Sequence, residues 1–331
     1  MTYPIALGSA QWAREAVKGT DLPATSVMIV ENFDFASGSV IVRPATARGL
    51  LVRNRGHEMI SMFGGNWSAS GPMVYEQLQN WLCMVENVAT PTGPSPYIWT
   101  HTRNPAANAA PASFTFERRE TDAATPYTQV GHYGMMSRLL LSGAGPDELV
   151  RFEAEGFCRK IQIAEAFTAA LTMPTPEFPP YALCKVYIDS TWAALGSTQV
   201  TSQVLAWSVE HLTGLIPRVT ADGRTDLDFN VHDINSGEVG INASITCLLG
   251  AQYPIEQAAA AAKTLRAVRI QIDGSGGRQL QIDFLAKYEQ PEIPEFGEDE
   301  GGRTVVLNLV DSTDGTNFLR YKLTNLVATL S

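Results

Sequence analysis

The amino-acid sequence predicts a mainly β protein with two antiparallel β-sandwich or barrel modules, each carrying one flanking α-helix. Three observations lead to this fold class. Apolar and polar residues alternate through much of the chain, which is the pattern of strands with one buried face. Four prolines fall within residues 171–183, where they favour an extended linker. One helical pattern lies on each side of that segment.

The clearest strand is predicted over residues 239–247, where apolar side chains occupy every second position. Residues 150–155 have the same period, which places Arg151, Glu153 and Glu155 together on one face. Residues 269–273 and 279–288 also alternate, and the glycine-rich stretch between them predicts a hairpin turn. Further strands are expected at 39–43, 49–53, 97–101, 113–119, 134–143, 185–189, 226–233, 304–310 and 318–330.

Two segments have helical patterns. Residues 71–88 place a stripe of large apolar side chains on one face, and Pro72 sits where a first helical turn accepts proline. Residues 254–268 begin with a proline and contain a run of alanines, which have high helix propensity. Each half of the chain therefore has one expected helix.

The proline-rich segment sets the predicted domain boundaries. We expect an N-terminal arm over 1–26, a first β module over 27–170, a linker over 171–180 and a second β module over 181–331. Both halves show several strands and one helix, which suggests an internal duplication.

Composition excludes some classes of protein. The 331 residues are 45% hydrophobic, which is typical of a globular chain. Asp and Glu outnumber Lys and Arg by 34 to 24, and a net charge near −10 argues against a surface that grips nucleic acid. Neither a secretory signal nor a membrane span is expected, and Cys83, Cys158, Cys184 and Cys247 are expected to be free thiols.

Catalytic and metal-binding motifs are absent from the sequence, so no enzyme activity and no cofactor is expected. Asp226, Asp228 and His232 fall on one predicted strand face, which we interpret as a solvated surface in preference to a metal site. Residues 274–277 suit a hairpin better than a phosphate-binding loop, because no helix follows them. The acidic stretch 297–302 has no ordered ligand spacing and is expected to be a solvated loop.

The succession of these segments resembles the siphophage-type tail tube protein (major tail protein) family. In the first half the resemblance rests on the strand pair around SGSVIVR, the helix in GPMVYEQLQNWL, and the segments YIWTHTRNP, SFTFERRE, GMMSRLLLSG and VRFEAEGF. In the second half it rests on KVYID, VLAWSVEHLTGL, DLDFNVHD, VGINASITCLL, the second helix, QLQIDFLAKYEQPEIP and YKLTNLVATL. The N-terminal lead 1–26 and the Pro-, Ala- and Asn-rich stretch 86–110 depart from the family pattern.

This resemblance implies a structural virion protein whose rings stack into the phage tail tube, the conduit for DNA ejection into the host. Two modules per chain imply a homotrimeric ring with pseudo-six-fold symmetry, and a single module with an added domain implies six chains. Other tail proteins are the expected partners, and double-stranded DNA is expected to pass through the lumen without specific binding. No association of the protein with a membrane is expected. The implied location is the phage tail of the virion, after assembly in the bacterial host cytoplasm.

Polar strand faces that lack Lys and Arg are candidates for the lumen of such a tube. These residues are Asp226, Asp228, Asn230, Asn242, Ser244 and Thr246. A position on the outside of the ring or in a contact between subunits is an equally weighted alternative for them. We expect long loops over 49–71 and 86–112 to reach the next ring.

Other functions remain open at the level of the sequence. A distal tail or baseplate ring protein would share the same barrel. A non-polymerising β-sandwich that binds a receptor or a glycan belongs to a second class, and it predicts a small oligomer that never forms tubes. An enzyme is the third and least favoured class.

Overall fold

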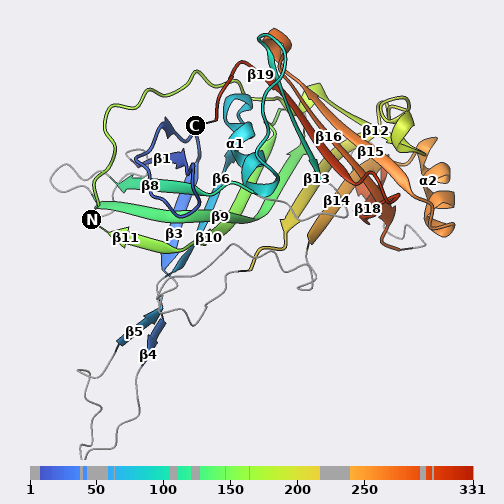
Figure 1. Cartoon of the computed structure of the whole chain (residues 1–331). Coiled ribbons are helices and arrows are strands. Elements are labelled where there is room, and N and C mark those ends of the chain that lie inside the picture. Colours follow the sequence, from blue (N-terminus) through green and yellow to red (C-terminus); the bar gives the residue numbers. More distant parts are fainter. Residues whose placement is uncertain are drawn as a thin grey trace, which may run out of the picture.

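The computed structural model describes residues 8–37, 40–42, 59–62, 64–103, 111–120, 127–145, 147–163, 165–216, 239–290, 296–299 and 302–330. The prediction of a mainly β, antiparallel fold is confirmed, and the described residues contain two α-helices, one in each half of the chain (Figure 1). Three groups of strands make up the architecture.

The first group is a long sheet, in which each strand hydrogen-bonds to the next in antiparallel fashion. Its order is β3 (Asn32–Ser37), β6 (Gly65–Pro72), β10 (Arg151–Cys158), the C-terminal part of β9 (Tyr127–Ala144), β13 (Val204–Thr213), β14 (Val239–Leu248) and β18 (Gly302–Asp311). One face of every strand packs into the core, as the alternation of apolar residues requires.

The second group of strands packs across the core from the long sheet. Its order is β12 (Cys184–Asp189), β15 (Arg266–Asp273), β16 (Gln279–Tyr288), β19 (Leu319–Asn325) and β7 (Tyr97–Arg103). The two groups join where Tyr288 at the end of β16 pairs with Leu309 of β18. The predicted hairpin is confirmed, because Asp273 of β15 pairs with Gln279 of β16 around a turn in which Gly276 and Gly277 have φ of 61° and 83°.

The third group is built on the N-terminal part of β9. That segment pairs with β8 (Phe114–Glu120) and β11 (Lys160–Ile163). β8 pairs in turn with β1 (Ser9–Arg14), and β1 pairs with β2 (Ser26–Val27). β9 changes from this group to the long sheet near Tyr133, which has a φ of 50°. The carboxylate of Glu15 accepts the backbone N–H of Tyr133 at 2.9 Å, so this N–H is satisfied outside the strand ladder.

A separate hairpin is formed by β4 (Val40–Val42) and β5 (Met59–Met62), which pair only with each other among the described strands. Figure 1 shows this hairpin lying away from the three groups. Immediately after it, β6 is a central strand of the long sheet. The expected loop over 49–71 is therefore wrong where β5 and β6 occupy it, and the expected loop over 86–112 is wrong at Tyr97–Arg103.

Helix α1 (Tyr75–Val85) lies between the two main layers, in contact with β9 and β13 on one side and β7 and β19 on the other (Figure 1). All of its residues are buried, so it is an enclosed helix, whereas the sequence pattern indicated one apolar face. The polar residues on it find internal partners. Gln77, for example, accepts the backbone N–H of Ile29 at 2.9 Å and donates to Val27 O at 2.6 Å.

Aromatic side chains fill the core around α1. The rings of Trp12 and Trp81 meet edge to face with centroids 4.5 Å apart, and Trp67 lies 4.8 Å from Phe116. Free thiols contribute to the same core. Cys83, Cys158 and Cys247 are buried and Cys184 is half-buried, which confirms four unpaired cysteines.

Helix α2 (Gln252–Ala261) is shorter than the predicted 254–268. Lys263 has a φ of 52°, and the backbone N–H of Thr264 bonds to Ala259 O at 2.9 Å, which ends the helix in a left-handed turn. The chain then enters β15 at Arg266. Ala267 and Val268, the apolar residues at the end of the predicted helix, belong to this strand, and both are buried.

The two halves of the chain are tied together in the long sheet and in the core. β9 from the first half pairs with β13 from the second, and β7 pairs with β19. One continuous hydrophobic core includes side chains from both halves. The division into two modules stays a prediction, and within the predicted arm 1–26 the residues of β1 and the first residue of β2 are paired into a sheet.

Candidate functional site

The outer face of the long sheet is an extended surface built from strands of both halves of the chain. Because side chains alternate along each strand, the residues between the buried ones all point to this side. We name this surface the polar sheet face. Its polar members are Asn32, Asp34, Asn66, Ser68, Ser70, Arg138, Ser142, Arg151, Glu153, Glu155, Ser208, Glu210, Asn242, Ser244, Thr246 and Asn308, which are exposed or half-buried.

The strand register arranges these side chains in rows across the sheet. One row runs from Asn308 through Ser244 and Ser208 to Ser142. A second row pairs Asn242 with Glu210, which lies opposite Leu140, and Leu140 lies opposite Glu153. The first row thus carries small hydroxyl side chains, and the second carries two carboxylates with Leu140 between them.

Arg138 forms ion pairs with three carboxylates on this face. Its Nε lies 2.5 Å from Glu210 Oε1, and its Nη1 lies 3.1 Å from Glu155 and 3.7 Å from Glu153. The hydrogen bond from Arg138 lowers the pKa of Glu210, whose other oxygen accepts from Asn242 Nδ2 at 3.3 Å. Three carboxylates therefore surround one guanidinium.

The other guanidiniums at this surface are paired as well. Arg151 of β10 forms an ion pair with Glu31, just before β3. Arg118 reaches from β8 to Asp34 Oδ1 at 2.7 Å. An arginine held by a carboxylate offers fewer free donors to a phosphate group, so the face presents carboxylates and hydroxyls in preference to open cations.

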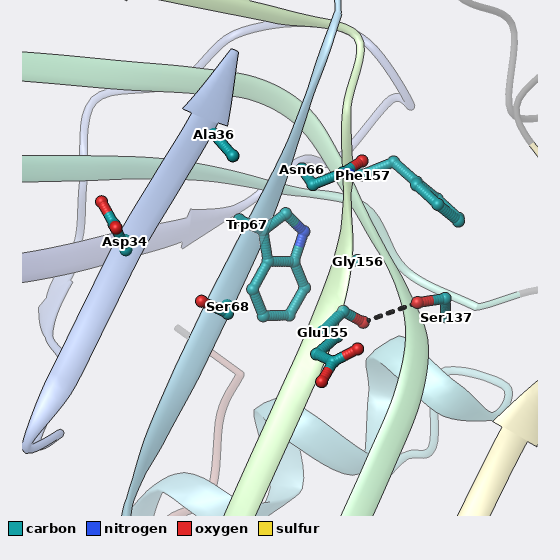
Figure 2. Close-up of a pocket in the computed structure, with 9 residues that line it drawn as sticks. All are labelled: Asp34, Ala36, Asn66, Trp67, Ser68, Ser137, Glu155, Gly156 and Phe157. Atoms are coloured by element: carbon teal, nitrogen blue, oxygen red, sulfur yellow. Dashed lines mark hydrogen bonds between the residues drawn. The ribbon is translucent and has the colours of Figure 1, made fainter. Parts of the chain in front are cut away.

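A shallow pocket of about 220 Å³ lies in this face, where β9 has a bulge opposite β10 (Figure 2). The register of β10 against β9 shifts between Glu155 and Gly156, which leaves Ser137 without an opposite residue. Ser137 Oγ donates to Glu155 O at 3.1 Å, and the indole Nε1 of Trp67 donates to Met135 O at 3.1 Å. The pocket is lined by Asp34, Ala36, Asn66, Trp67, Ser68, Ser137, Glu155, Gly156 and Phe157.

Half of the predicted lumen-facing residues lie on the polar sheet face. Asn242, Ser244 and Thr246 share the outer side of β14. Asp226, Asp228 and Asn230 lie outside the described residues, and so does His232. Whether any of these faces the lumen of a tube stays a prediction.

The partners that complete this face are not predictable from the sequence alone. The alternation in residues 150–155 places Arg151, Glu153 and Glu155 on one side of a strand, but it identifies no neighbours for them. The structure brings Arg138 and Glu210 beside them through the pairing of β9 with β10 and β13. Alternation in residues 204–213 was the available signal, yet alternation does not reveal which strands pair. The neighbouring strands also bring arginines to a face whose β14 portion has none.

The long sheet ends in strands with an open edge. Among the described strands, β3 pairs only with β6, and β17 (Phe296–Asp299) pairs only with β18. An open strand edge has unpaired backbone donors and acceptors, which can accept a strand of another chain.

Comparison with known proteins gives no relative: no family model and no curated protein matches this sequence. No helix within the described ranges is long and apolar enough to cross a membrane. In that same part of the chain, no three His, Cys, Asp or Glu side chains come close enough together to hold a metal ion.

Proposed function

We propose that this chain is a structural protein of a phage tail, whose copies form rings that stack into the tube through which double-stranded DNA leaves the virion. The observation that carries this proposal is the polar sheet face, an extended surface on which Arg138 and Arg151 are paired to carboxylates. Such a surface suits the wall of an aqueous channel for a polyanion, because few cations are free to bind phosphates.

The edges of the long sheet support ring formation. β3 lies at one end of the sheet and β17 lies against β18 at the other, and both have an open side among the described strands. When the edge of one copy pairs with the opposite edge of the next, the contact is head to tail, and a head-to-tail contact that closes gives a ring. The sheets of the copies then form one continuous barrel wall.

The proposed number of chains per ring depends on whether each half of the chain acts as one module of the ring. Each half of the chain contributes strands to the long sheet, with β3, β6, β10 and β9 from the first and β13, β14 and β18 from the second. Three chains would therefore give a ring with pseudo-six-fold symmetry, and six chains are the alternative. The β4–β5 hairpin lies away from the sheets and is our candidate for contact with a neighbouring ring or another tail protein.

Electron microscopy of the purified protein at high concentration tests this function. We expect rings or tubes with three- or six-fold symmetry around an open hole in end-on views. Compact particles that never stack would contradict the proposal. Such particles would favour a β-sandwich that binds a receptor or a glycan. Screening the protein against a glycan array would then test for glycan binding. Single rings that join only other tail proteins would favour a distal tail or baseplate ring.

A further inference from the structure

The C-terminal end of α1 carries a cluster of ionisable groups that the proposed function does not use. Glu86 follows the last helical residue, and its backbone N–H closes the helix on Leu82 O at 2.9 Å. Its side chain is fully buried, and neither carboxylate oxygen receives a well-aligned hydrogen bond from a described residue. A buried carboxyl without such bonds favours its neutral form.

Two basic side chains approach the two oxygens of this carboxyl from different strands. Arg103 Nη1, on β7, lies 3.6 Å from Oε2 of Glu86, and His211 Nε2, on β13, lies 3.3 Å from Oε1. The other ring nitrogen of His211 lies 3.1 Å from the hydroxyl of Tyr321, on β19. The cluster thus connects α1 with both layers of the fold.

The described neighbours of these basic and phenolic groups are neutral or apolar. His101 on β7 lies opposite Tyr321, is buried, and has its Nδ1 3.0 Å from Asn87 O. Leu139 on β9 is buried and lies opposite His211. Burial raises the pKa of Glu86 to about 7, while the charge of Arg103 opposes the shift. Burial and the charge of Arg103 lower the pKa of His211 to about 3, so this imidazole stays neutral near pH 7.

We propose that Glu86, Arg103, His211 and Tyr321 form a proton-dependent clasp that holds the end of α1 in two ways. With its proton, Glu86 donates to Nε2 of His211, and the Nδ1–H of the imidazole donates to Tyr321. When the carboxyl releases its proton to solvent, the carboxylate pairs with Arg103, the imidazole proton moves to Nε2, and Tyr321 donates to Nδ1. The imidazole stays neutral in both states, so one proton is lost in the exchange.

The direction of the pH effect follows from the two states of the chain. An unfolded chain ionises Glu86 near its ordinary pKa, whereas the folded chain holds the proton until about pH 7. Between these values the folded state binds more protons, so the contribution of Glu86 to stability is full at low pH and falls as the pH rises. Glu86→Gln removes this dependence.

The test compares thermal unfolding of the wild type and E86Q from pH 5 to pH 8. We expect the Tm of E86Q relative to the wild type to rise by several degrees across this range. E256Q is the matched control, because Glu256 is equally buried but accepts aligned hydrogen bonds from Arg266 and Tyr288. Its Tm difference from the wild type should stay constant with pH. A constant difference for E86Q as well would overturn the proposal.

Infrared spectroscopy of the unmodified protein gives a second readout, which does not depend on whether E86Q folds. The carbonyl band of a protonated, buried carboxyl should be present at pH 5 and lost by pH 8. R103M should move this loss to higher pH, since it removes the cation that favours the carboxylate. A wild type without such a band at pH 5 would contradict the clasp.

Discussion

Ser208 of β13 lies directly opposite Ser142 of β9, at the seam where the two halves of the chain meet in the long sheet. The proline-rich segment 171–180 separates these residues in sequence, yet the strand pairing makes them neighbours on the polar sheet face. A surface assembled in this way needs both halves of the chain to be folded together.

The seam can be tested with a designed disulfide. Opposed residues on antiparallel strands have Cα atoms about 4.5 to 5.5 Å apart, which a disulfide can bridge. We therefore expect S142C/S208C to cross-link on oxidation and to hold the halves together after proteolysis within 165–179. S142C/S244C is the control, since β13 lies between these strands and separates the residues by about 9 to 10 Å. Equal cross-linking of both variants would contradict the observed order of strands.

Gly156 of β10, beside the bulge of β9, is a position where a side chain cannot be placed. An added Cβ would lie 1.9 Å from Met135 O and 2.7 Å from the indole of Trp67. We expect G156A to lower the free energy of unfolding by about 2 to 4 kcal/mol in urea denaturation. G93A, at a glycine with φ of 80° and open space around it, should cost about 1 kcal/mol. A similar small loss for G156A would show that the strands can part at the bulge.

Asp283 on β16 is a fully buried carboxylate that binds two arginines. Its oxygens accept from Arg269 Nε at 2.6 Å and from Arg320 Nη2 at 2.5 Å. D283N removes the charge that both guanidiniums require, so we expect a loss of about 3 to 5 kcal/mol in the free energy of unfolding. K185A, at the half-exposed pair between Lys185 and Asp273, should cost less than about 1 kcal/mol. A D283N variant as stable as K185A would refute this assignment.

The buried His101 predicts sensitivity to acid. Burial lowers its pKa to about 4, so the folded protein keeps the ring neutral where an unfolded chain already binds a proton. The contribution of this histidine to stability is therefore full above about pH 6.5 and is lost as the pH falls toward 4. H101Q should reduce the loss of unfolding free energy between these values by up to about 3 kcal/mol. An unchanged pH profile would mean that His101 is already solvated in the folded state.

The carboxylates around Arg138 should keep DNA from binding to the polar sheet face. E153Q/E155Q/E210Q removes all three, which frees a guanidinium for phosphate contacts. We expect this variant to retain double-stranded DNA at low salt and to release it as salt rises, whereas the wild type retains little. D147N/E148Q/E289Q makes the same change in net charge at exposed positions outside that face. If both variants retained double-stranded DNA equally, the change in net charge alone would explain the binding, and the release of Arg138 would not be needed.

Much of the secondary structure is predictable from local patterns. The alternation in VGINASITC and QLQIDFLAKY identifies β14 and β16, because each strand has one buried face. GNWSASGP is different, since glycine, serine and proline usually indicate a loop. Here Trp67 and Ala69 fill the core while Asn66 and Ser68 face outward, which makes the segment a central strand.

The polar sheet face could be predicted only in part. The charged side of RFEAEGF is visible in the sequence, and so is the polar side of β14. What makes them one surface is the pairing of β10 with β9, of β9 with β13 and of β13 with β14. Long-range pairing depends on the packing of the whole core around α1, so local periodicity does not specify it.

The most direct test of the tail-tube proposal is a cryo-electron microscopy reconstruction of the assembled protein. It would locate two positions on the polar sheet face, Glu153 on β10 and Asn242 on β14, relative to the axis of the assembly. The proposal predicts stacked rings in which both residues line an open central channel. Rings in which both residues point outward, or a protein that stays a small closed oligomer at every concentration, would contradict it.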